Sequence, residues 1–272
     1  MFAKKKEPLP RTIGLLTDFG VTDPYVGQLK GVLARKAPAC PVVDISHRVE
    51  PFNVAQAGFF LASSYMHFPK DAVILAVVDP GVGTDRRIAA ATIGERILLA
   101  PDNGLLSLAL GNAWTEEVRT FDLSVALQAR DKVAHTFHGR DVFAPLAAWL
   151  ALGGDPGSLG TEIDPADLVA PQWASPEVAA GRAVGHVLHI DRFGNCVLSL
   201  ATGTLPAAGR FELVSPAHGE LAFALTYAEM PDGRPGLLEG SQGFLEIAIN
   251  QRSAARQLGL SMGDRVELRW EE

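Results

Sequence analysis

Four short apolar runs constrain the fold of this chain more than any other feature of its sequence. They lie within residues 12–20, 41–47, 72–80 and 96–104. Segments with helical spacing of apolar residues follow them, at residues 23–38, 53–69, 104–111 and 140–153. The run AVILAVV is apolar on both faces, as are strands that are covered on both sides of a sheet. Such strands alternating with helices predict an α/β domain with a Rossmann-like, mostly parallel sheet.

The character of the sequence changes after residue 153. Residues 153–181 are rich in Gly, Pro and Asp and have little periodicity, which indicates a linker. Strand-like segments separated by turns follow: AVGHVLHID, NCVLSL, GRFELVS, LAFALTYAE, FLEIAIN and DRVELRW. We therefore expect an N-terminal α/β domain at residues 1–165 and a smaller all-β domain at residues 182–272.

Composition excludes several classes of function. The 272 residues carry a net charge of −7, which disfavours a nucleic-acid partner. Two cysteines, Cys40 and Cys196, are too few for a disulfide framework and do not indicate a metal site. The longest apolar run, residues 72–78, is too short to cross a membrane, and the N-terminal segment MFAKKKEPLP lacks the apolar region of a secretory signal. We expect a cytoplasmic protein with no membrane or nucleic-acid partner and no metal.

Polar side chains stand at the ends of the four predicted strands. In order, they are Asp18, then Asp44 and His47, then Asp79, then Asp102 and Asn103. Ligands of open α/β sheets bind beyond the carboxyl ends of the strands. Any one of these residues can be an ordinary turn former, but the set of four strand ends indicates a site.

The sequence lacks the motifs of the commonest nucleotide-binding, hydrolase and zinc sites. There is no Walker A sequence, no G-x-G-x-x-G after the first strand, no G-x-S-x-G and no H-E-x-x-H. The loop GVGTDRR places Arg86 and Arg87 a few residues after Asp79, and His138 follows in TFHGRD. A histidine next to a cleft with an acid and an arginine can position water or take its proton. A core or surface role for His138 is the alternative.

Seven segments in order resemble one enzyme family. They are TDFG with DPYVGQLKGVL, DISHRVEPFNVAQA, VVDPGVGTDRR, LLAPDNGLLSL, FHGRDVFAPLAAWLA, HIDRFGNCVLSL and SQGFLEIAINQRSAA. Together they resemble the S-adenosylmethionine (SAM) hydrolases, also called SAM hydroxide adenosyltransferases, whose fold is shared by the fluorinases and chlorinases. The resemblance runs from about residue 11 to residue 269. It implies a C-terminal β-barrel and a homotrimer with active sites between subunits.

The resemblance also implies residues that bind the substrate, SAM, with no further cofactor. Asp18 is expected to hold the ribose hydroxyls, and Asp23 and Asp191 the methionine ammonium group. Ser241 is expected to contact the methionine carboxylate; the fluorinase has an arginine next to that serine, and this chain has Gln242. The adenosine is expected to lie among Phe52, Phe193, Asn195 and Asn250.

The hydrolase branch uses an Asp, an Arg seven residues later and a His to handle water. Asp79, Arg86 and His138 match that pattern, although Arg87 can take the place of its neighbour. Water held by this set would attack C5′ of the ribose in line with the leaving methionine, giving adenosine. The sequence leaves open whether Asp79 or His138 takes the proton, and which sulfonium epimer reacts. Hydrolysis of SAM looks wasteful, and removal of the wrong epimer, (R)-SAM, is the hypothesis that would explain it.

Two alternatives remain at this level. The first is a chlorinase-like halogenase, in which Gly139 occupies the place of the fluorinase's halide-binding serine. The second is a non-catalytic sensor of adenosine or SAM. Asp79 and His138 favour hydrolysis over halogenation, because water needs groups that orient it and remove its proton.

Overall fold

The computed structural model describes residues 10–113, 116–128, 133–206 and 209–271. The prediction that the chain has no secretory signal concerns residues 1–10, and nine of these ten residues lie outside the described ranges. The chain divides into two compact units, residues 1–170 and 171–272. Within the described part of the chain, no helix combines the length and apolar character needed to cross a membrane.

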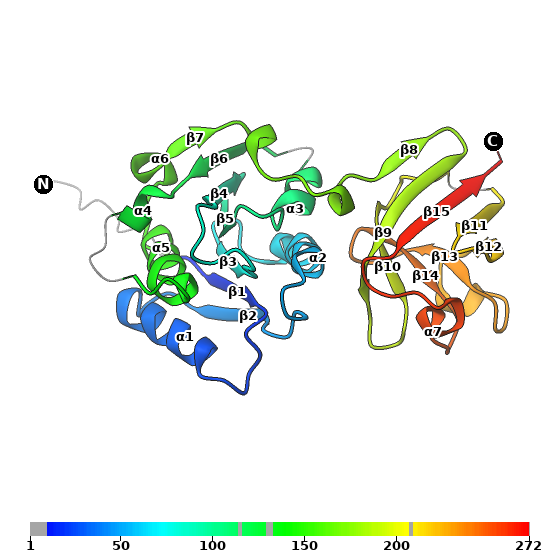
Figure 1. The fold of residues 1–272 in the computed structure, drawn as a ribbon, viewed down its shortest axis with the longest axis horizontal. Helices are drawn as coiled ribbons and strands as arrows, with labels where there is room; N and C mark the ends of the chain where they lie inside the picture. Colours follow the sequence, from blue (N-terminus) through cyan, green and yellow to red (C-terminus); the bar gives the residue numbers. More distant parts are fainter. Residues whose placement is uncertain (1–9, 114–115, 129–132, 207–208, 272) are drawn as a thin grey trace, which may run out of the picture. The chain divides into compact units, whose positions relative to one another are not determined.

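The first unit is built on a seven-stranded sheet with the order β2-β1-β3-β5-β4-β6-β7 (Figure 1). Its strands are β1 (Ile13–Thr17), β2 (Val42–Ser46), β3 (Val73–Val77), β4 (Ile88–Ile93), β5 (Arg96–Pro101), β6 (Val118–Asp122) and β7 (Thr161–Ile163). The pairs β1–β2, β1–β3 and β3–β5 are parallel, and β4 and β7 run antiparallel to their neighbours. The predicted α/β class is confirmed, as a mixed sheet with a parallel core.

Helices pack on both faces of this sheet (Figure 1). They are α1 (Tyr25–Lys36), α2 (Val54–Ser64), α3 (Ser107–Gly111), α4 (Val125–Gln128), α5 (Ala144–Ala151) and α6 (Pro156–Leu159), with 3₁₀ turns at Tyr65–His67 and Pro165–Asp167. Leu29 and Leu33 of α1 join α5 and one sheet face in a single apolar core. Helix α2 begins at a capping Asn53, whose side chain accepts the N–H of Gln56.

Two predictions about this unit need correction. The strands β4, β6 and β7 were not predicted. β4 is the alanine-rich segment IAAATI, which has weak strand propensity, and β7 lies within residues 153–181, which were expected to form a linker. The helix expected over residues 140–153 is α5 preceded by a π-helical turn at Gly139–Phe143, in which the N–H of Ala144 bonds to the carbonyl of Gly139. A π turn widens the backbone locally and often marks a functional position; here it directly follows His138.

The second unit is a closed β-barrel. Its strands are β8 (Glu177–Ala179), β9 (Arg182–Ile190), β10 (Cys196–Ala201), β11 (Phe211–Ser215), β12 (Gly219–Phe223), β13 (Gly236–Glu239), β14 (Phe244–Ala248) and β15 (Arg265–Trp270). They follow the order β10-β14-β13-β12-β11-β15-β9-β8, and pairing of β10 with β9 closes the barrel, with β8 attached outside. Helix α7 (Ala254–Leu258) and 3₁₀ turns at Gln172–Ala174 and Tyr227–Glu229 complete the unit.

The barrel confirms the all-β prediction and corrects one strand. The segment LAFALTYAE was expected to form one strand, but β12 ends at Phe223 and Tyr227 begins a 3₁₀ turn. β12 and β13 pair in parallel, which requires the long connection between them that carries this turn. The barrel core is apolar, with Leu213, Leu237 and Ile247 fully buried.

Candidate active site

The carboxyl ends of β1 and β3 border a cavity of about 360 Å³ in the first unit. Four of the predicted site residues of this unit line it: Asp18, Phe52, Asp79 and His138. β1 and β3 are parallel neighbours in register, so the residues that follow them emerge side by side at one edge of the sheet. The sheet therefore gathers residues that lie up to 120 positions apart in the chain.

Asp79, Arg86 and His138 form one connected group. Nε of Arg86 donates to both carboxylate oxygens of Asp79, at 2.8 and 2.9 Å, and its Nη2 donates to Oδ2 as well. The same Nη2 lies 3.0 Å from Nδ1 of His138. The side chains of Arg86 and Asp79 are 8% and 6% exposed, so this ion pair is shielded from solvent. Arg86 also lies over the ring of Phe143, 5.6 Å from its centroid.

Arg87 takes part in a different ion pair. Its Nε donates to Oδ2 of Asp102 at 2.9 Å, and its Nη2 donates to the carbonyl of Asp167. The other oxygen of Asp102 accepts the N–H of Val169 at 2.9 Å. The arginine that contacts Asp79 is therefore Arg86, while Arg87 ties the end of the first unit to the end of β5.

The hydrogen bond from Arg86 fixes the protonation of His138. A guanidinium can only donate, so Nδ1 of His138 is the acceptor and the neutral ring carries its proton on Nε2. Burial, and then the charge of Arg86, lower the pKa of His138 below its ordinary value. The imidazole is thus neutral near pH 7, with its basic nitrogen already occupied.

Asp18 and Phe52 are linked at the rim of the same cavity. Oδ2 of Asp18 accepts the N–H of Phe52 at 2.9 Å. Phe52 has φ of 66°, in the left-handed region that costs a non-glycine residue energy, and its side chain is exposed. Burial raises the pKa of Asp18, and the nearby charge of Asp79 acts in the same direction. A strained aromatic residue held by a carboxylate at a cavity rim is typical of a binding site.

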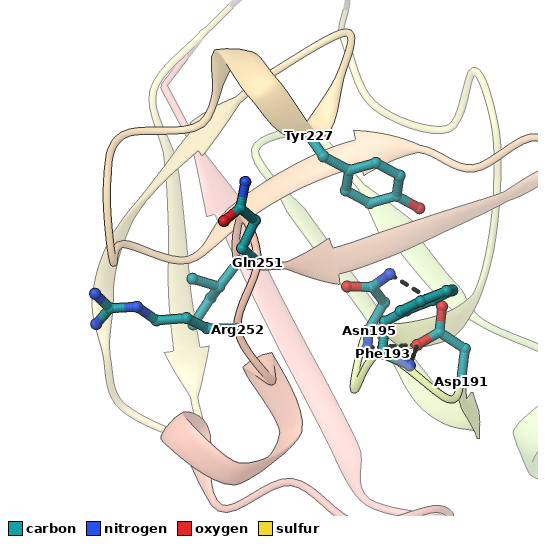
Figure 2. A pocket seen from close by; sticks show the side chains of 7 residues that line it. Asp191, Phe193, Asn195, Tyr227, Gln251 and Arg252 are labelled. Carbon is teal, nitrogen blue, oxygen red and sulfur yellow. Dashed lines mark hydrogen bonds between the residues drawn. The ribbon is translucent and has the colours of Figure 1, made fainter.

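The second unit has its own cavity, of about 500 Å³ (Figure 2). Asp191, Phe193 and Asn195 line it from the turn between β9 and β10. Oδ1 of Asp191 accepts the N–H groups of Phe193 and Asn195, at 2.9 and 2.8 Å, and Oδ2 accepts Nδ2 of Asn195 at 3.0 Å. Asp191 therefore shapes the turn, and its carboxylate keeps limited capacity for a further donor.

Arg86 contacts Asp79 and His138 but does not itself line the first cavity, and three predicted substrate-binding residues line neither cavity. Asp23 is exposed just before α1, Ser241 is exposed on the β13–β14 turn, and Asn250 is half-buried. Their expected contacts with the substrate remain predictions.

Several lining residues were not predicted. Phe19, Tyr25 and Phe137 form edge-to-face pairs beside the first cavity, with ring centroids 5.3–6.1 Å apart. Tyr227, Gln251 and Arg252 line the second. The only sequence signal for these residues was their nearness to recognised motifs, as for Phe19 in TDFG and Gln251 in INQ.

The described residues contain no cluster of three or more His, Cys, Asp and Glu side chains suited to holding a metal ion. The polar groups of the first cavity are instead engaged with one another, as Asp79 is with Arg86. That the reaction uses no cofactor remains a prediction.

Two solved bacterial structures share the fold of this chain over nearly its whole length. A conserved protein of Thermotoga maritima matches with a TM-score of 0.79 at 31% identity, covering 95% of this chain and 100% of that one. A conserved hypothetical protein of Thermus thermophilus matches with a TM-score of 0.75 at 38% identity, covering 96% of this chain and 100% of that one. The two-unit fold is therefore one that these bacterial proteins share over their whole length.

Sequence comparison then gives the family. Family models for the SAM hydroxide adenosyltransferase N-terminal and C-terminal domains match residues 13–160 and 185–267. The (R)-S-adenosyl-L-methionine hydrolase of Thermus thermophilus is 40% identical over 267 residues, 95% of this chain and 99% of that protein. That of Salinispora arenicola is 37% identical, over 94% and 97% of the two chains. A fluorinase of Actinopolyspora mzabensis is more distant, at 28% identity over 94% and 96%. The chain belongs to the SAM hydroxide adenosyltransferase family.

Proposed function

We propose that this protein is an enzyme that hydrolyses S-adenosyl-L-methionine, in its (R)-sulfonium form, to adenosine and L-methionine. The observation that carries the proposal is the buried Asp79–Arg86–His138 group, of which Asp79 and His138 line the same cavity as Asp18. Relatives named (R)-S-adenosyl-L-methionine hydrolase, at 37–40% identity over nearly the whole chain, support the same reaction.

In the homotrimer that the resemblance implies, the first cavity of one subunit and the second cavity of another each supply part of the substrate site. Asp18 accepts hydrogen bonds from the ribose hydroxyls, and Phe52 forms an apolar wall next to it. In the second unit, Phe193 and Asn195 contact the adenosine, and Asp191 contributes negative charge for the methionine ammonium group. A carboxylate that already accepts three hydrogen bonds contributes mainly through its charge and one remaining lone pair.

The attacking water is oriented by His138 and loses its proton to Asp79. His138 cannot take that proton while its Nδ1 accepts from Arg86, so its Nε2–H donates to the water oxygen. Asp79 accepts three hydrogen bonds from Arg86 and keeps one free lone pair, on Oδ1, for the proton. The Arg86 cation favours the hydroxide character that develops. The sulfonium needs no acid to leave, so alignment of water with C5′ supplies much of the acceleration, on the order of 7–11 kcal/mol.

The halogenase alternative is less well supported. The fluorinases are the more distant relatives, and the cavity presents an acid and an imidazole rather than a small apolar pocket. The homotrimer with active sites between subunits and the cytoplasmic location stay predictions; sedimentation of the purified protein tests the former.

The test is turnover of racemic SAM in water enriched in the heavy oxygen isotope, with and without chloride, followed by chromatography and mass spectrometry. We expect adenosine that carries the heavy oxygen at its 5′ position, regardless of chloride, and we expect purified (S)-SAM to react far more slowly than the racemate. A halogenated nucleoside would identify a halogenase. Bound adenosine without turnover would identify a sensor.

A neighbouring pair of variants supplies the control. Arg86→Gln breaks both contacts of the Asp79–Arg86–His138 group, whereas Arg87→Gln removes the same charge one position later and breaks only the contact with Asp102 and the Asp167 carbonyl. We expect Arg86→Gln to lose activity at least about a hundredfold and Arg87→Gln to keep most of it. Equal losses would contradict the assigned role of Arg86.

A further inference from the structure

A buried acid of the barrel, Glu246, has no role in the reaction described so far. It lies on β14 and is 8% exposed, yet β14 is otherwise apolar and buried. Its Oε2 accepts a hydrogen bond of 2.8 Å from the hydroxyl of Tyr227. A buried carboxyl group is costly to fold unless it is hydrogen-bonded, so its presence next to a cavity requires an explanation.

The barrel is shaped to accommodate this side chain. A Cβ atom placed on Gly240 would clash with Oε1 of Glu246, so a side chain at residue 240 would displace the carboxyl group. Burial raises the pKa of Glu246, and the charge of Asp191 raises it further, which places both acids in the same region of the barrel. The absence of a side chain at Gly240 therefore leaves room for the carboxyl group that accepts from Tyr227, a residue that lines the second cavity.

Tyr227 connects this acceptor to the cavity itself. It lies in the long connection between β12 and β13 and is 43% exposed. Figure 2 shows its ring across the cavity from the turn that carries Asp191, Phe193 and Asn195. The ring is therefore a wall of the cavity, carried by a loop and attached at its far end to a barrel strand.

We propose that Glu246 is a positioning residue for the substrate, which acts by holding the Tyr227 ring in place as a wall of the nucleoside cavity. This inference rests on the proposed function, because it takes the occupant of the cavity to be the nucleoside part of SAM. A tyrosine whose hydroxyl is fixed has little rotational freedom left to lose when a ligand packs against its ring. Without the bond, binding must first order the ring.

The test compares one variant that removes this bond with one that weakens it. Tyr227→Phe keeps the ring and removes the hydroxyl. Glu246→Gln keeps the shape and an oxygen acceptor but removes the charge that strengthens the bond. We expect Tyr227→Phe to weaken adenosine binding about tenfold by calorimetry, equal to about 1.4 kcal/mol. We expect KM for SAM to rise by a similar factor and kcat to change less than about twofold, because the contact is made equally in the ground and transition states.

Two further variants distinguish positioning from electrostatics. In the Tyr227→Phe background, Glu246→Gln should add less than about a twofold effect, because no hydroxyl remains for residue 246 to hold. Glu220→Gln removes one charge from an exposed position on β12 and should change neither constant.

The outcomes separate this inference from the proposed function. Tyr227→Phe with unchanged adenosine affinity and KM, or an undiminished effect of Glu246→Gln in its background, would overturn the positioning role while hydrolysis by the wild-type protein stands. If Tyr227→Phe loses adenosine affinity as expected while the wild-type protein does not turn SAM over, the positioning role is supported and only the hydrolase is overturned. Failure of the wild-type protein to bind adenosine would overturn both.

Discussion

Replacement of Asp79 by Asn should destabilise the first unit as well as stop the reaction. The change preserves shape and leaves the Arg86 cation unpaired in a place where both side chains are less than a tenth exposed. Arg86 is held between His138 and the Phe143 ring and cannot easily turn to solvent. Removing one partner of a buried ion pair costs about 3–5 kcal/mol. For a unit of this size, the unfolding midpoint should fall by about 6–20 °C.

Calorimetry and urea unfolding of Asp79→Asn measure this loss. The double variant Asp79→Asn/Arg86→Gln has no buried charge left uncompensated, so it should recover much of the stability and none of the activity. Glu162→Gln serves as the matched control, because Glu162 pairs with Arg119 in an equally well-formed but exposed pair and should leave the midpoint unchanged. An unchanged midpoint for Asp79→Asn, or a double variant less stable than either single one, would refute the reasoning.

Three further predictions follow from the same geometry. The pKa of His138 is lowered from 6.5, and only the neutral ring can accept the hydrogen bond from Arg86. The value of kcat/KM should therefore be constant above pH 6.5 and decrease at lower pH, where the ring becomes protonated. A decrease that begins above pH 6.5 would contradict this. Asn53→Ala removes the cap of α2 and should cost about 1 kcal/mol in urea unfolding, with turnover per folded molecule retained. Gly139→Ser brings a Cβ to 3.1 Å from the Phe19 ring, so it should reduce adenosine formation without producing a halogenated nucleoside, as mass spectrometry can show.

The sequence alone determined the elements whose signal is local. The apolar run of β3 and the Asn53 cap of α2 are read from neighbouring residues, and both are present. The polar residues after β1 and β3 could be expected to meet, because parallel neighbouring strands end at one edge of a sheet. Fold class, the division into an α/β and an all-β part, and the family were therefore accessible without coordinates.

The tertiary structure decided what depends on which face a side chain occupies. Arg86 and Arg87 are adjacent, and adjacent residues of an extended chain point in opposite directions, so only one can contact Asp79. That choice depends on how β4 lies beside β5, and β4 has no clear signal of its own. Tyr227 and Glu246 are 19 residues apart on a turn and a strand, and only the packing of the β12–β13 connection beside β14 brings the hydroxyl to the carboxyl group. Pairings of this kind result from long-range packing, which no local pattern in the sequence encodes.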